Sequence, residues 1–501
     1  MPVLTYPGVY IEEVPSGVRT ITGVATSIAL FIGWAARGPT DRAVRLASFA
    51  DFVRVYGSGD PTGLDSRALL GYAVRHFYSN GGADAYVLRI ADDDAVTATS
   101  AIGDLAISAS SPGGWSDAYQ VRLTPRADDA TRFRIDILHT PANGAIVESF
   151  ENLSMASDDA RFVAAVVNGR SNFITVDAPN TNLPAGVQTV DLGATQAGAD
   201  GTVLAPTDPD FLTALTGLFG VGTPTEAIDL FNILCIPGLA DGNTIEEMQA
   251  RCAERRAFLI VDGPEDETVA NMPAALTTLD ITGTNATHSA LYFPWVRAPD
   301  PLQQNALRAF PPCGFVAGIY ARTDGTRGVW KAPAGSEASL NGASGLVITM
   351  SDRENGQLNP RAINCLRTLP VFGTVVWGAR TLHGDNDRGS EWKYVPVRRL
   401  TLFIEESLYR GTQWVVFEPN DEPLWAQIRL NVGAFMQNLF RQGAFQGRSP
   451  REAYFVKCDS ETTTQNDINL GIVNTHVGFA PLKPAEFVVI RIQQMAGQVE
   501  A

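Results

Sequence analysis

Asp262 is the side chain of this 501-residue sequence whose position most resembles that of a catalytic group. It ends the apolar run "FLIVD", and α/β sheets often place catalytic or magnesium-binding carboxylates at the carboxyl end of a strand. Aspartate before "GPEDE" is also a common turn and helix-cap residue, and we favour this structural role. The alternative, an α/β hydrolase or transferase that uses Asp262 and a histidine brought close by folding, stays open.

Other arrangements that could support catalysis or metal binding are sparse. The five histidines are scattered: His76, His139, His288, His383 and His476. None has HExxH spacing, no GxSxG or GxxxxGK[ST] motif occurs, and "GLFGVG" at 217–222 lacks the lysine of a phosphate loop. The acidic triplet 92–94 could ligate calcium, but without an EF-hand pattern we interpret it as a solvated domain boundary. We therefore predict no catalytic residue, no cofactor and no metal site.

Composition and charge narrow the function classes. The chain is 45% apolar and 18% charged, which is typical of globular proteins, and its length suggests about three domains. Five scattered cysteines fit buried free thiols better than disulfides or zinc. The net charge of −16 argues against direct binding of nucleic acid. Residues 91–210 contain 17 acidic residues and 6 arginines, a net charge of −11, so we expect a separate solvated unit there.

The first residues, "MPVLTYPGVY", have no basic leader region. The longest apolar run, 24–36, is too short to cross a bilayer. We expect a soluble protein that folds in the cytoplasm and does not insert directly into membranes.

The periodicity of the chain predicts an α/β core that is interrupted once. A strand within 18–35, a helix within 66–82 and a strand at 85–90 follow one another in β-α-β order. From residue 92 to about 220 short alternating runs predict a strand-rich insertion. The α/β pattern then resumes with a helix capped by Thr244 and Glu247, a strand at 257–262, and further strands at "SALYFPWV" and "FVAGIYA".

The last quarter predicts two amphipathic helices, within 398–411 and 424–443, and a closing strand within 484–495. Between Leu424 and Lys457 the chain carries five basic residues and one acid, a local excess of +4. Such a face is an ordinary solvated surface or a site for an acidic partner. Both chain ends are strand-like. Each strand either docks on its own sheet or adds to a neighbouring copy, and a heterologous contact that does not close generates a helical filament.

Several short blocks resemble one known family. The opening "YPGVYIEEVPSGVRTITGVATSI" and "SFADFVRVYG" resemble the N-terminal region of contractile tail sheath proteins of phage tails and contractile injection systems. The blocks "LNPRAINCLR", "VVWGARTL", "YVPVRRLTLFIEESL", "VVFEPNDEPLW", "FVKCD" and "APLKPAEFVVIRI" follow in the order that the family shows. The resemblance covers roughly 5–90 and 220–495.

The resemblance implies an α/β and α+β multidomain subunit, not an enzyme, that assembles into stacked hexameric rings around an inner tube. It also implies baseplate and terminator or cap proteins as partners, and a place in a phage tail or injection particle. The expected domains are an N-terminal arm at 1–20, an α/β sheath domain at 21–91 and 221–370, an acidic outer insertion at 92–220, a C-terminal tube-facing domain at 371–484 and a C-terminal strand arm at 485–501. A non-contractile tube or surface-lattice protein is a further alternative.

The same resemblance assigns roles to individual residues. The inter-subunit arm strands would be formed by Val9, Tyr10, Ile11, Glu12, Glu13, Phe487, Val488, Val489, Ile490, Arg491 and Ile492. The surface that faces the tube would contain Gln427, Asn431, Asn438, Arg441, Arg448 and Arg451. Without a phosphate-binding motif, we expect contraction to use energy stored during assembly and no nucleotide.

Overall fold

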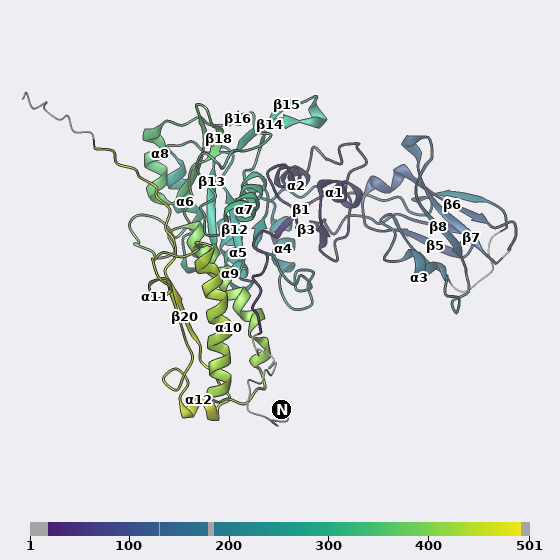
Figure 1. Ribbon diagram of the computed structural model, residues 1–501. Coiled ribbons are helices and arrows are strands. Elements are labelled where there is room, and N and C mark those ends of the chain that lie inside the picture. The colour runs from purple at the N-terminus through teal and green to yellow at the C-terminus, as the bar shows by residue number, and fades with distance from the viewer. Residues whose placement is uncertain (1–18, 130, 179–184, 492–501) are drawn as a thin grey trace, which may run out of the picture. The chain divides into compact units, whose positions relative to one another are not determined.

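The computed structural model describes residues 19–129, 131–178 and 185–491, and the structural statements below concern these residues. The chain divides into two compact units, described separately. The larger, the α/β unit, contains 25–329 and 333–398. The smaller, the C-terminal unit, contains the segment before residue 25, the short stretch 330–332 and the chain from residue 399 onward. Figure 1 labels the elements of both units.

An eight-stranded sheet organises the α/β unit, and its strand order is β18-β17-β13-β12-β11-β1-β3-β2. Its strands are β1 (Ala29–Trp34), β2 (Val44–Leu46), β3 (Ala85–Ile90), β11 (Ile233–Cys235), β12 (Phe258–Asp262), β13 (Ser289–Phe293), β17 (Ile363–Leu369) and β18 (Gly373–Val376). The six inner strands are parallel, whereas β2 and β18 pair antiparallel at the two edges. Strands from before and after the insertion therefore build one sheet, as the sequence predicts.

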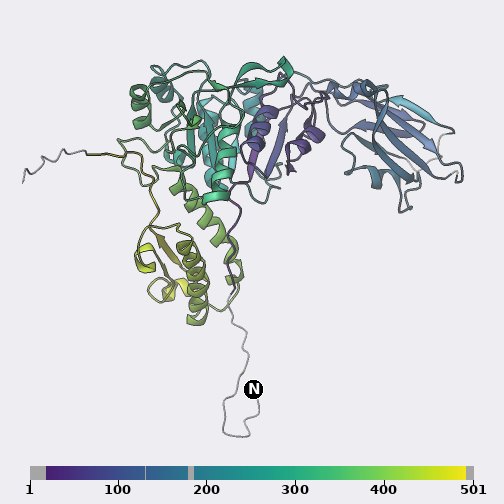
Figure 2. The same cartoon turned by 45° about the horizontal axis from the view of Figure 1, so that its top comes forward.

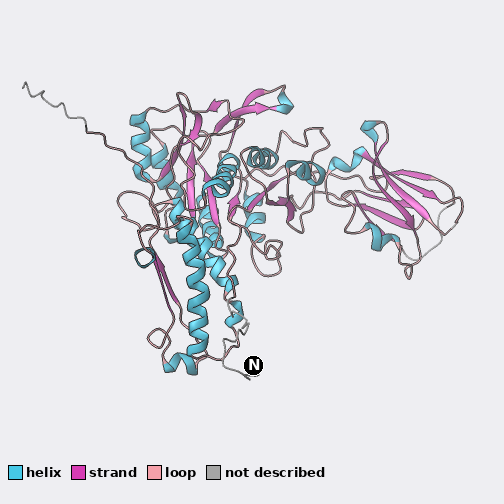
Figure 3. Ribbon diagram, in the orientation of Figure 1, coloured by secondary structure: helices cyan, strands magenta, loops and turns pink. Residues whose placement is uncertain are grey.

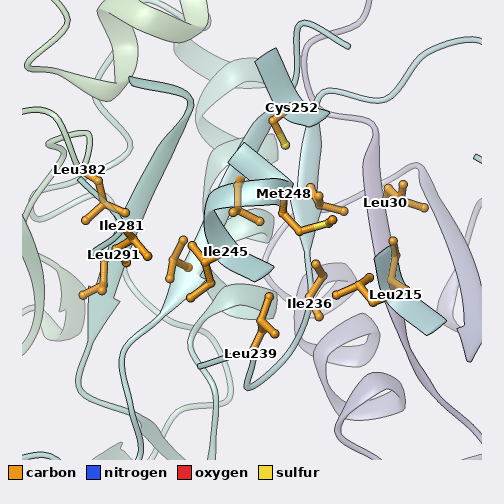
Figure 4. Packing of buried hydrophobic residues seen from close by; sticks show 14 of the residues in the cluster. Leu30, Leu215, Ile236, Leu239, Ile245, Met248, Cys252, Ile281, Leu291 and Leu382 are labelled. Atoms are coloured by element: carbon orange, nitrogen blue, oxygen red, sulfur yellow. The ribbon is translucent and has the colours of Figure 1, made fainter. Parts of the chain in front are cut away.

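Helices cover both faces of this sheet. They are α1 (Phe49–Tyr56), α2 (Leu69–Ser79), α4 (Pro209–Gly217), α5 (Gly242–Glu254), α6 (Met272–Leu279), α7 (Cys313–Arg327) and α8 (Asp352–Leu358). Successive side chains of β1 point to opposite faces of the sheet, and each face packs against a different layer of helices. Phe31 packs against Phe77 of α2 with ring centroids 5.4 Å apart, whereas Leu30 belongs to the cluster that contains Met248 of α5 (Figure 4). Because β1 is buried on both faces, its sequence is continuously apolar.

The run "FVAGIYA", predicted as a strand, is part of helix α7. Gly314 and Gly318 explain the difference. An added Cβ would lie 2.4 Å from the carbonyl oxygen of Ala73 at Gly314, and 2.6 Å from that of Phe77 at Gly318. These two glycines let α7 pack directly on the backbone of α2. The first nine residues of α7 are buried on all sides, so the sequence shows no helical stripe of polar residues there.

Two further predictions about this unit are corrected by the structure. The helix within 242–254 is capped by Asp241, whose carboxylate accepts hydrogen bonds from the backbone N–H (2.8 Å) and hydroxyl (2.6 Å) of Thr244. Thr244 is therefore inside the helix and does not form a capping box with Glu247. The predicted strand within 18–35 is shorter, because β1 begins at Ala29.

The insertion forms a separate strand-rich lobe with its own hydrophobic core (Figure 3). One sheet contains β4 (Thr99–Ile102), β5 (Leu105–Ala109) and β9 (Ile174–Asp177). The other contains β6 (Tyr119–Pro125), β7 (Phe133–His139), β8 (Ala145–Leu153) and β10 (Gln188–Asp191), and the short helix α3 (Val163–Val167) follows β8. The prediction placed the end of the insertion at residue 220. Helix α4 instead packs with the α/β core through Phe211 and Leu215, so the lobe ends earlier.

Arg37 connects the lobe to the sheet. Its guanidinium lies 4.7 Å from the ring centroid of Trp115 and 4.2 Å from that of Phe173, and it donates a 3.1 Å hydrogen bond to the carbonyl oxygen of Asn172. Arg89 donates from its own buried guanidinium to the carbonyl oxygens of Gly38 and Pro112, each at 2.9 Å. Backbone carbonyls thus hold both cations, and two aromatic faces also contact Arg37.

A small three-stranded sheet completes the α/β unit. It consists of β14 (Val296–Asp300), β15 (Ala306–Phe310) and β16 (Gly345–Leu346), in the order β15-β14-β16.

The C-terminal unit is built on a long helical hairpin (Figure 2). Its elements are α9 (Val395–Gly411, of which the first four residues belong to the α/β unit), α10 (Glu422–Arg441), α11 (Pro450–Ala453), β19 (Tyr454–Lys457), α12 (Gln465–Asn469) and β20 (His476–Phe479). Asp421 caps α10 by accepting a 3.3 Å hydrogen bond from the Leu424 N–H. Both predicted helices are present. β18, predicted as part of a domain at 371–484, lies in the sheet of the α/β unit.

Candidate assembly surfaces

Residues 482–491 end the described chain without joining a strand of the described residues. Four consecutive apolar side chains are exposed there: Phe487 is 75%, Val488 81%, Val489 79% and Ile490 80% exposed. An exposed apolar run of this kind marks a surface that another molecule covers. The predicted strand of 487–492 therefore stays a prediction for the single chain. Ile492, and the predicted N-terminal strand from Val9 to Glu13, lie outside the described residues.

The C-terminal unit contains a sheet of only two strands, β19 and β20. They pair antiparallel, from Tyr454 opposite Phe479 to Lys457 opposite His476. Neither strand has a further strand of the described chain on its outer side. A two-stranded ribbon is marginally stable alone, and here the Tyr454 hydroxyl anchors it to α10 through a 2.8 Å hydrogen bond to Oε1 of Gln437. This ribbon can accept additional strands.

The predicted tube-facing residues divide into two groups. Asn438, Arg441, Arg448 and Arg451 are exposed. Among the described residues, Arg429 and Lys457 of this region form ion pairs, and Arg441, Arg448 and Arg451 form none. The nearby Glu452 carboxylate accepts a 2.9 Å hydrogen bond from the backbone N–H of Arg448 and not from its guanidinium. Three cations near the end of α10 and in α11 are therefore available to an acidic partner.

Asn431 does not belong to this surface, and its prediction is corrected. It is 1% exposed, and its Oδ1 accepts a 3.1 Å hydrogen bond from the backbone N–H of Arg19. Gln427 is half-buried and has a bonding partner. The outward side of α10 instead carries Ala426, Leu430 and Ala434, with Leu430 52% exposed. Their spacing of four residues is visible in the sequence, but three small or apolar side chains resemble a buried stripe.

Asn431 is buried because the extended segment 19–24 lies along the α9–α10 hairpin. An added Cβ at Gly411 would meet Cγ2 of Ile21 at 2.5 Å, so Ile21 occupies the space that this glycine leaves open. The Val24 N–H donates a 3.2 Å hydrogen bond to the Ser407 hydroxyl. The Arg19 guanidinium lies 4.7 Å from the ring centroid of Trp414. We call residues 19–24 the strap.

Asp262 has a structural role. Its carboxylate accepts hydrogen bonds from the backbone N–H groups of Cys313 (2.7 Å) and Gly238 (3.0 Å), and it is 3% exposed. Cys313 is the first residue of α7, so Asp262 stabilises the start of that helix. Burial raises the pKa of the Asp262 carboxyl to about 6, and the two backbone donors oppose this rise.

The place where an α/β sheet usually binds ligands is filled. The strand order reverses between β1 and β11, and such switch points open a crevice at the carboxyl ends of the strands. At Gly238, which follows β11, Leu69, Pro206 and Trp295 lie 3.0, 3.2 and 3.8 Å from the position of a Cβ. In the described part of the chain, no group of three or more His, Cys, Asp or Glu side chains could hold a metal ion.

A cleft of about 650 Å³ lies where the lobe joins the sheet, lined in part by Arg37, Arg67, Asp65, Asp200 and Trp115. Three of its charged side chains already form ion pairs, because Arg67 contacts Asp65 at 2.6 Å and Asp200 at 2.9 Å. Asp262 does not line it. The cleft therefore gives no support to the enzymatic alternative.

Within the described ranges, no helix combines the length and the apolar character that a membrane crossing requires.

Comparison with known families identifies the class of protein that this fold and these surfaces define. The family model "Phage tail sheath protein central domain" matches residues 205–382, and the model "Phage tail sheath C-terminal domain" matches residues 387–495. Together they cover more than half of the chain. The chain belongs to the phage tail sheath protein family.

Individual relatives agree with this assignment. A prophage major tail sheath protein of Pseudomonas aeruginosa (strain UCBPP-PA14) is 25% identical over 266 residues, which are 52% of this chain and 64% of that protein. The tail sheath protein of Salmonella phage ViI is 26% identical over 164 residues, 32% of this chain and 24% of that protein. The chain thus spans less than two thirds of the length of these relatives.

Solved structures share the fold. The sheath complex of an extracellular contractile injection system, PVC, in its contracted state matches with a TM-score of 0.62 at 24% identity, covering 99% of both chains. A sheath tail protein from Listeria innocua matches with a TM-score of 0.60 at 14% identity, covering 92% of this chain and 96% of that one.

Proposed function

We propose that this chain is the repeating subunit of a contractile sheath, a structural protein and not an enzyme. In this role it polymerises as stacked hexameric rings around an inner tube and shortens to drive the tube through a target envelope. The observation that carries the proposal is the exposed apolar run Phe487–Ile490 in a chain that also contains a ribbon of only two strands, β19 and β20. Each feature is incomplete in one subunit and can be completed by another.

The two features suggest how neighbouring subunits are joined. An extended segment that adds to a sheet edge forms backbone hydrogen bonds, and its alternate side chains fill pockets. We propose that Phe487–Ile492, and the arm strand Val9–Glu13, pair with the β19–β20 ribbon of other copies. Each backbone hydrogen bond contributes about 0.5–1.5 kcal/mol net, so a few of them tether a subunit without fixing its orientation. Such tethers can persist while the folded bodies rotate during contraction.

The tube contact is proposed at Asn438, Arg441, Arg448 and Arg451. These residues are exposed, and an acidic tube surface would complement the three arginines. Exposed ion pairs contribute about 0–1 kcal/mol each, so the contact can release when the sheath shortens. The baseplate and a terminator or cap protein are the other proposed partners, in a phage tail or a headless injection particle assembled in the bacterial cytoplasm.

Contraction is proposed to need no nucleotide. The energy is stored in the extended arrangement, and the faces of the α/β units become more buried on contraction. Buried apolar surface contributes about 25 cal/mol per Å², so small gains add up over a polymer.

The test is electron microscopy of the purified chain, alone and with the tube protein encoded beside it. The expected result is hollow tubes in two lengths that interconvert without ATP. Particles of a single length would favour a non-contractile tube. A monodisperse 53.7 kDa species under both conditions would contradict the proposal.

A further inference from the structure

Each sheet of the lobe ends in a strand with no further strand of the described chain on its outer side. One sheet ends in β9, in the order β4-β5-β9, and the other ends in β8, in the order β10-β6-β7-β8. The outer edge of an end strand presents backbone N–H and C=O groups, and an extended segment of another molecule pairs with such groups. The contacts at these two edges therefore decide whether lobes of different copies join.

The side chain of Asn168 occupies the outer edge of β9. Its amide donates a 2.9 Å hydrogen bond to the carbonyl oxygen of Val176 and accepts a 2.8 Å hydrogen bond from the N–H of the same residue. Val176 lies opposite Ile107 of β5, and both of its backbone groups point away from β5, since Asn168 binds them. The amide thus forms the two hydrogen bonds that a residue of an added strand would form.

Helix α3 holds Asn168 in this position. Asn168 directly follows α3, and its N–H donates a 3.1 Å hydrogen bond to the carbonyl oxygen of Ala164. Three valines of α3 are buried in the core of the lobe. Asn168 itself is exposed, so water would reach the backbone groups of Val176 if the amide were removed. Folding therefore does not depend on this amide to satisfy Val176, and what the amide excludes is another strand.

Arg161 covers the end of the outer edge of β8. Its guanidinium donates hydrogen bonds to the carbonyl oxygens of two successive residues, Glu151 and Asn152, the latter at 3.3 Å. Both residues lie where the register of β8 against β7 shifts. An irregular edge with a cation bonded to its carbonyls is a poor template for strand addition.

Glu148 of β8 shows that the two edges lie on one side of the lobe. Its carboxylate accepts hydrogen bonds from the Ser171 hydroxyl (2.7 Å) and from the backbone N–H (3.0 Å) and the side-chain amide (2.9 Å) of Asn172. Ser171 and Asn172 belong to the turn between α3 and β9. A strand added to either edge would thus approach the same surface.

We propose that Asn168 and Arg161 are edge-blocking residues, which prevent the lobes of different copies from pairing through β9 and β8. The excluded partner is a second copy of this chain. Antiparallel pairing of two β9 strands would place Val176 of one copy opposite Val176 of the other, and each would exchange both backbone hydrogen bonds with its counterpart. The proposed sheath function adds only that many copies lie close together. In that setting, blocked lobes leave strand addition to the C-terminal unit.

Charge repulsion does not replace these side chains. Residues 91–210 carry a net charge of −11, so two lobes repel each other at low salt. At physiological salt the screening length is about 8 Å, and repulsion between exposed charges beyond that distance is largely lost. A hydrogen-bonded side chain at the edge acts at contact and does not weaken in this way.

The first test measures pairing at β9 by disulfide formation. A full-length copy with Thr175→Cys is mixed with one that carries Asp177→Cys, in a glutathione redox buffer. Both positions are exposed and flank Val176, whereas the five native cysteines are buried. We expect Asn168→Ala in both copies to increase the cross-linked fraction by about tenfold, the effect of two added backbone hydrogen bonds. Arg170→Ala, in the same turn, is the control and should leave the cross-linked fraction unchanged.

The second test measures association through β8. Arg161→Ala and the control Arg170→Ala each remove one positive charge from an acidic lobe, so an effect of charge alone would weaken association equally in both. We expect Arg161→Ala alone to associate about tenfold more strongly than the unmodified chain in sedimentation velocity. The difference should be larger at about 1 M salt than at about 0.1 M, because the repulsion is then screened.

The outcomes that would overturn the proposal are specific. Unchanged cross-linking in Asn168→Ala and unchanged association in Arg161→Ala, with a lower melting temperature, would show that the two side chains only stabilise the fold. Equal effects in Arg170→Ala would assign the result to charge. Near-ultraviolet circular dichroism of the buried Trp115 reports whether the lobe stays folded, and either variant tests the proposal if the other does not fold. Neither readout requires tubes, so failure of the sheath function would be seen separately.

Discussion

The backbone N–H of Arg19 donates a 3.1 Å hydrogen bond to Oδ1 of Asn431, a residue 412 positions further along the chain. This bond is one of the contacts that hold the strap against the α9–α10 hairpin, together with Ile21 on Gly411 and Val24 on Ser407. The beginning of the described chain is thus fixed to the C-terminal unit. A tether that is pulled at its end transmits force to the body only if its first residues are held in this way.

Gly411→Ala is expected to displace the strap. The new methyl group would lie 2.5 Å from Cγ2 of Ile21, which is too close, so Ile21 must move. Overpacking of this kind costs about 1–3 kcal/mol. We expect faster tryptic cleavage after Arg19 and a lower melting temperature.

Gly433→Ala is the matched control for this prediction. Gly433 lies inside α10 with no heavy atom within 4 Å of the added Cβ, so the substitution should be neutral or stabilising by up to about 1 kcal/mol. Equal cleavage rates in the two variants would show that the position of Ile21 does not require a residue without a side chain at position 411.

Val488→Asp combined with Ile490→Asp is expected to abolish polymerisation and leave the subunit folded. Both side chains are about four-fifths exposed, so the change costs the single subunit little, whereas a strand that docks into another copy would bury two charges. Sedimentation and negative-stain images measure assembly, and circular dichroism measures folding. Ile146→Asp, at a side chain of β8 that is 51% exposed, is the control and should still assemble. Normal tubes from the double variant would show that the run Phe487–Ile490 is not needed for assembly.

Charge reversal at Arg441, Arg448 and Arg451 is expected to weaken assembly on the tube and not the self-assembly of the sheath. The loss of binding should be largest at low salt, where the unmodified contact is strongest. At 0.1 M salt the screening length is about 10 Å, so exposed charge pairs are already weakened and their loss changes binding less. Arg353→Glu, an equally exposed arginine on α8, should have no effect. The measurement is co-sedimentation with preformed tubes over a salt series. A uniform loss at all salt concentrations would indicate a packing defect and not an electrostatic contact.

His76 is expected to make the α/β unit sensitive to acid. Its ring stacks on Phe315 with centroids 3.9 Å apart, and burial, helped by nearby Arg75, lowers its pKa to about 3. The unfolded chain takes up this proton near pH 6.5. The stability that neutral His76 contributes is therefore complete above pH 6.5 and is lost as the pH falls from 6.5 towards 3, by up to about 1.4 kcal/mol per pH unit.

His76→Leu should flatten this part of the pH profile of unfolding, measured by urea denaturation between pH 4 and 7. His476→Gln, at an exposed histidine, should leave the profile unchanged. A His76→Leu profile as steep as that of the unmodified chain would assign the acid sensitivity to other groups.

The arrangement of the sheet could be predicted well from the sequence. β3 spans the six residues "AYVLRI" that the pattern indicates, and strands on either side of the insertion join one sheet, as their apolar runs suggest. Parallel strands buried on both faces are continuously apolar, so they are visible in composition alone. The same reasoning failed for α7, because a helix buried on all sides has a similar apolar run.

The candidate surfaces could be predicted less completely. The exposure of Arg441, Arg448 and Arg451 follows from their charge, and the exposure of Phe487–Ile490 as an unpaired run is consistent with their predicted role. Asn431 could not be placed, because its polarity gives no indication that a segment 412 residues away covers it. The outward position of Leu430 is likewise a consequence of how α10 packs.

By itself, the sequence determined which stretches are strands and helices in most of the chain, that an acidic, strand-rich insertion interrupts an α/β core, and that the protein resembles sheath subunits. These properties depend on local periodicity and composition. Only the tertiary structure decided that Asp262 holds the start of α7, that Asn431 is covered by the strap, and that among the described residues no third strand joins the β19–β20 ribbon. The physical reason is that the environment of a polar or edge group is set by residues distant in sequence, and periodicity shows which face of an element is apolar but not what covers it.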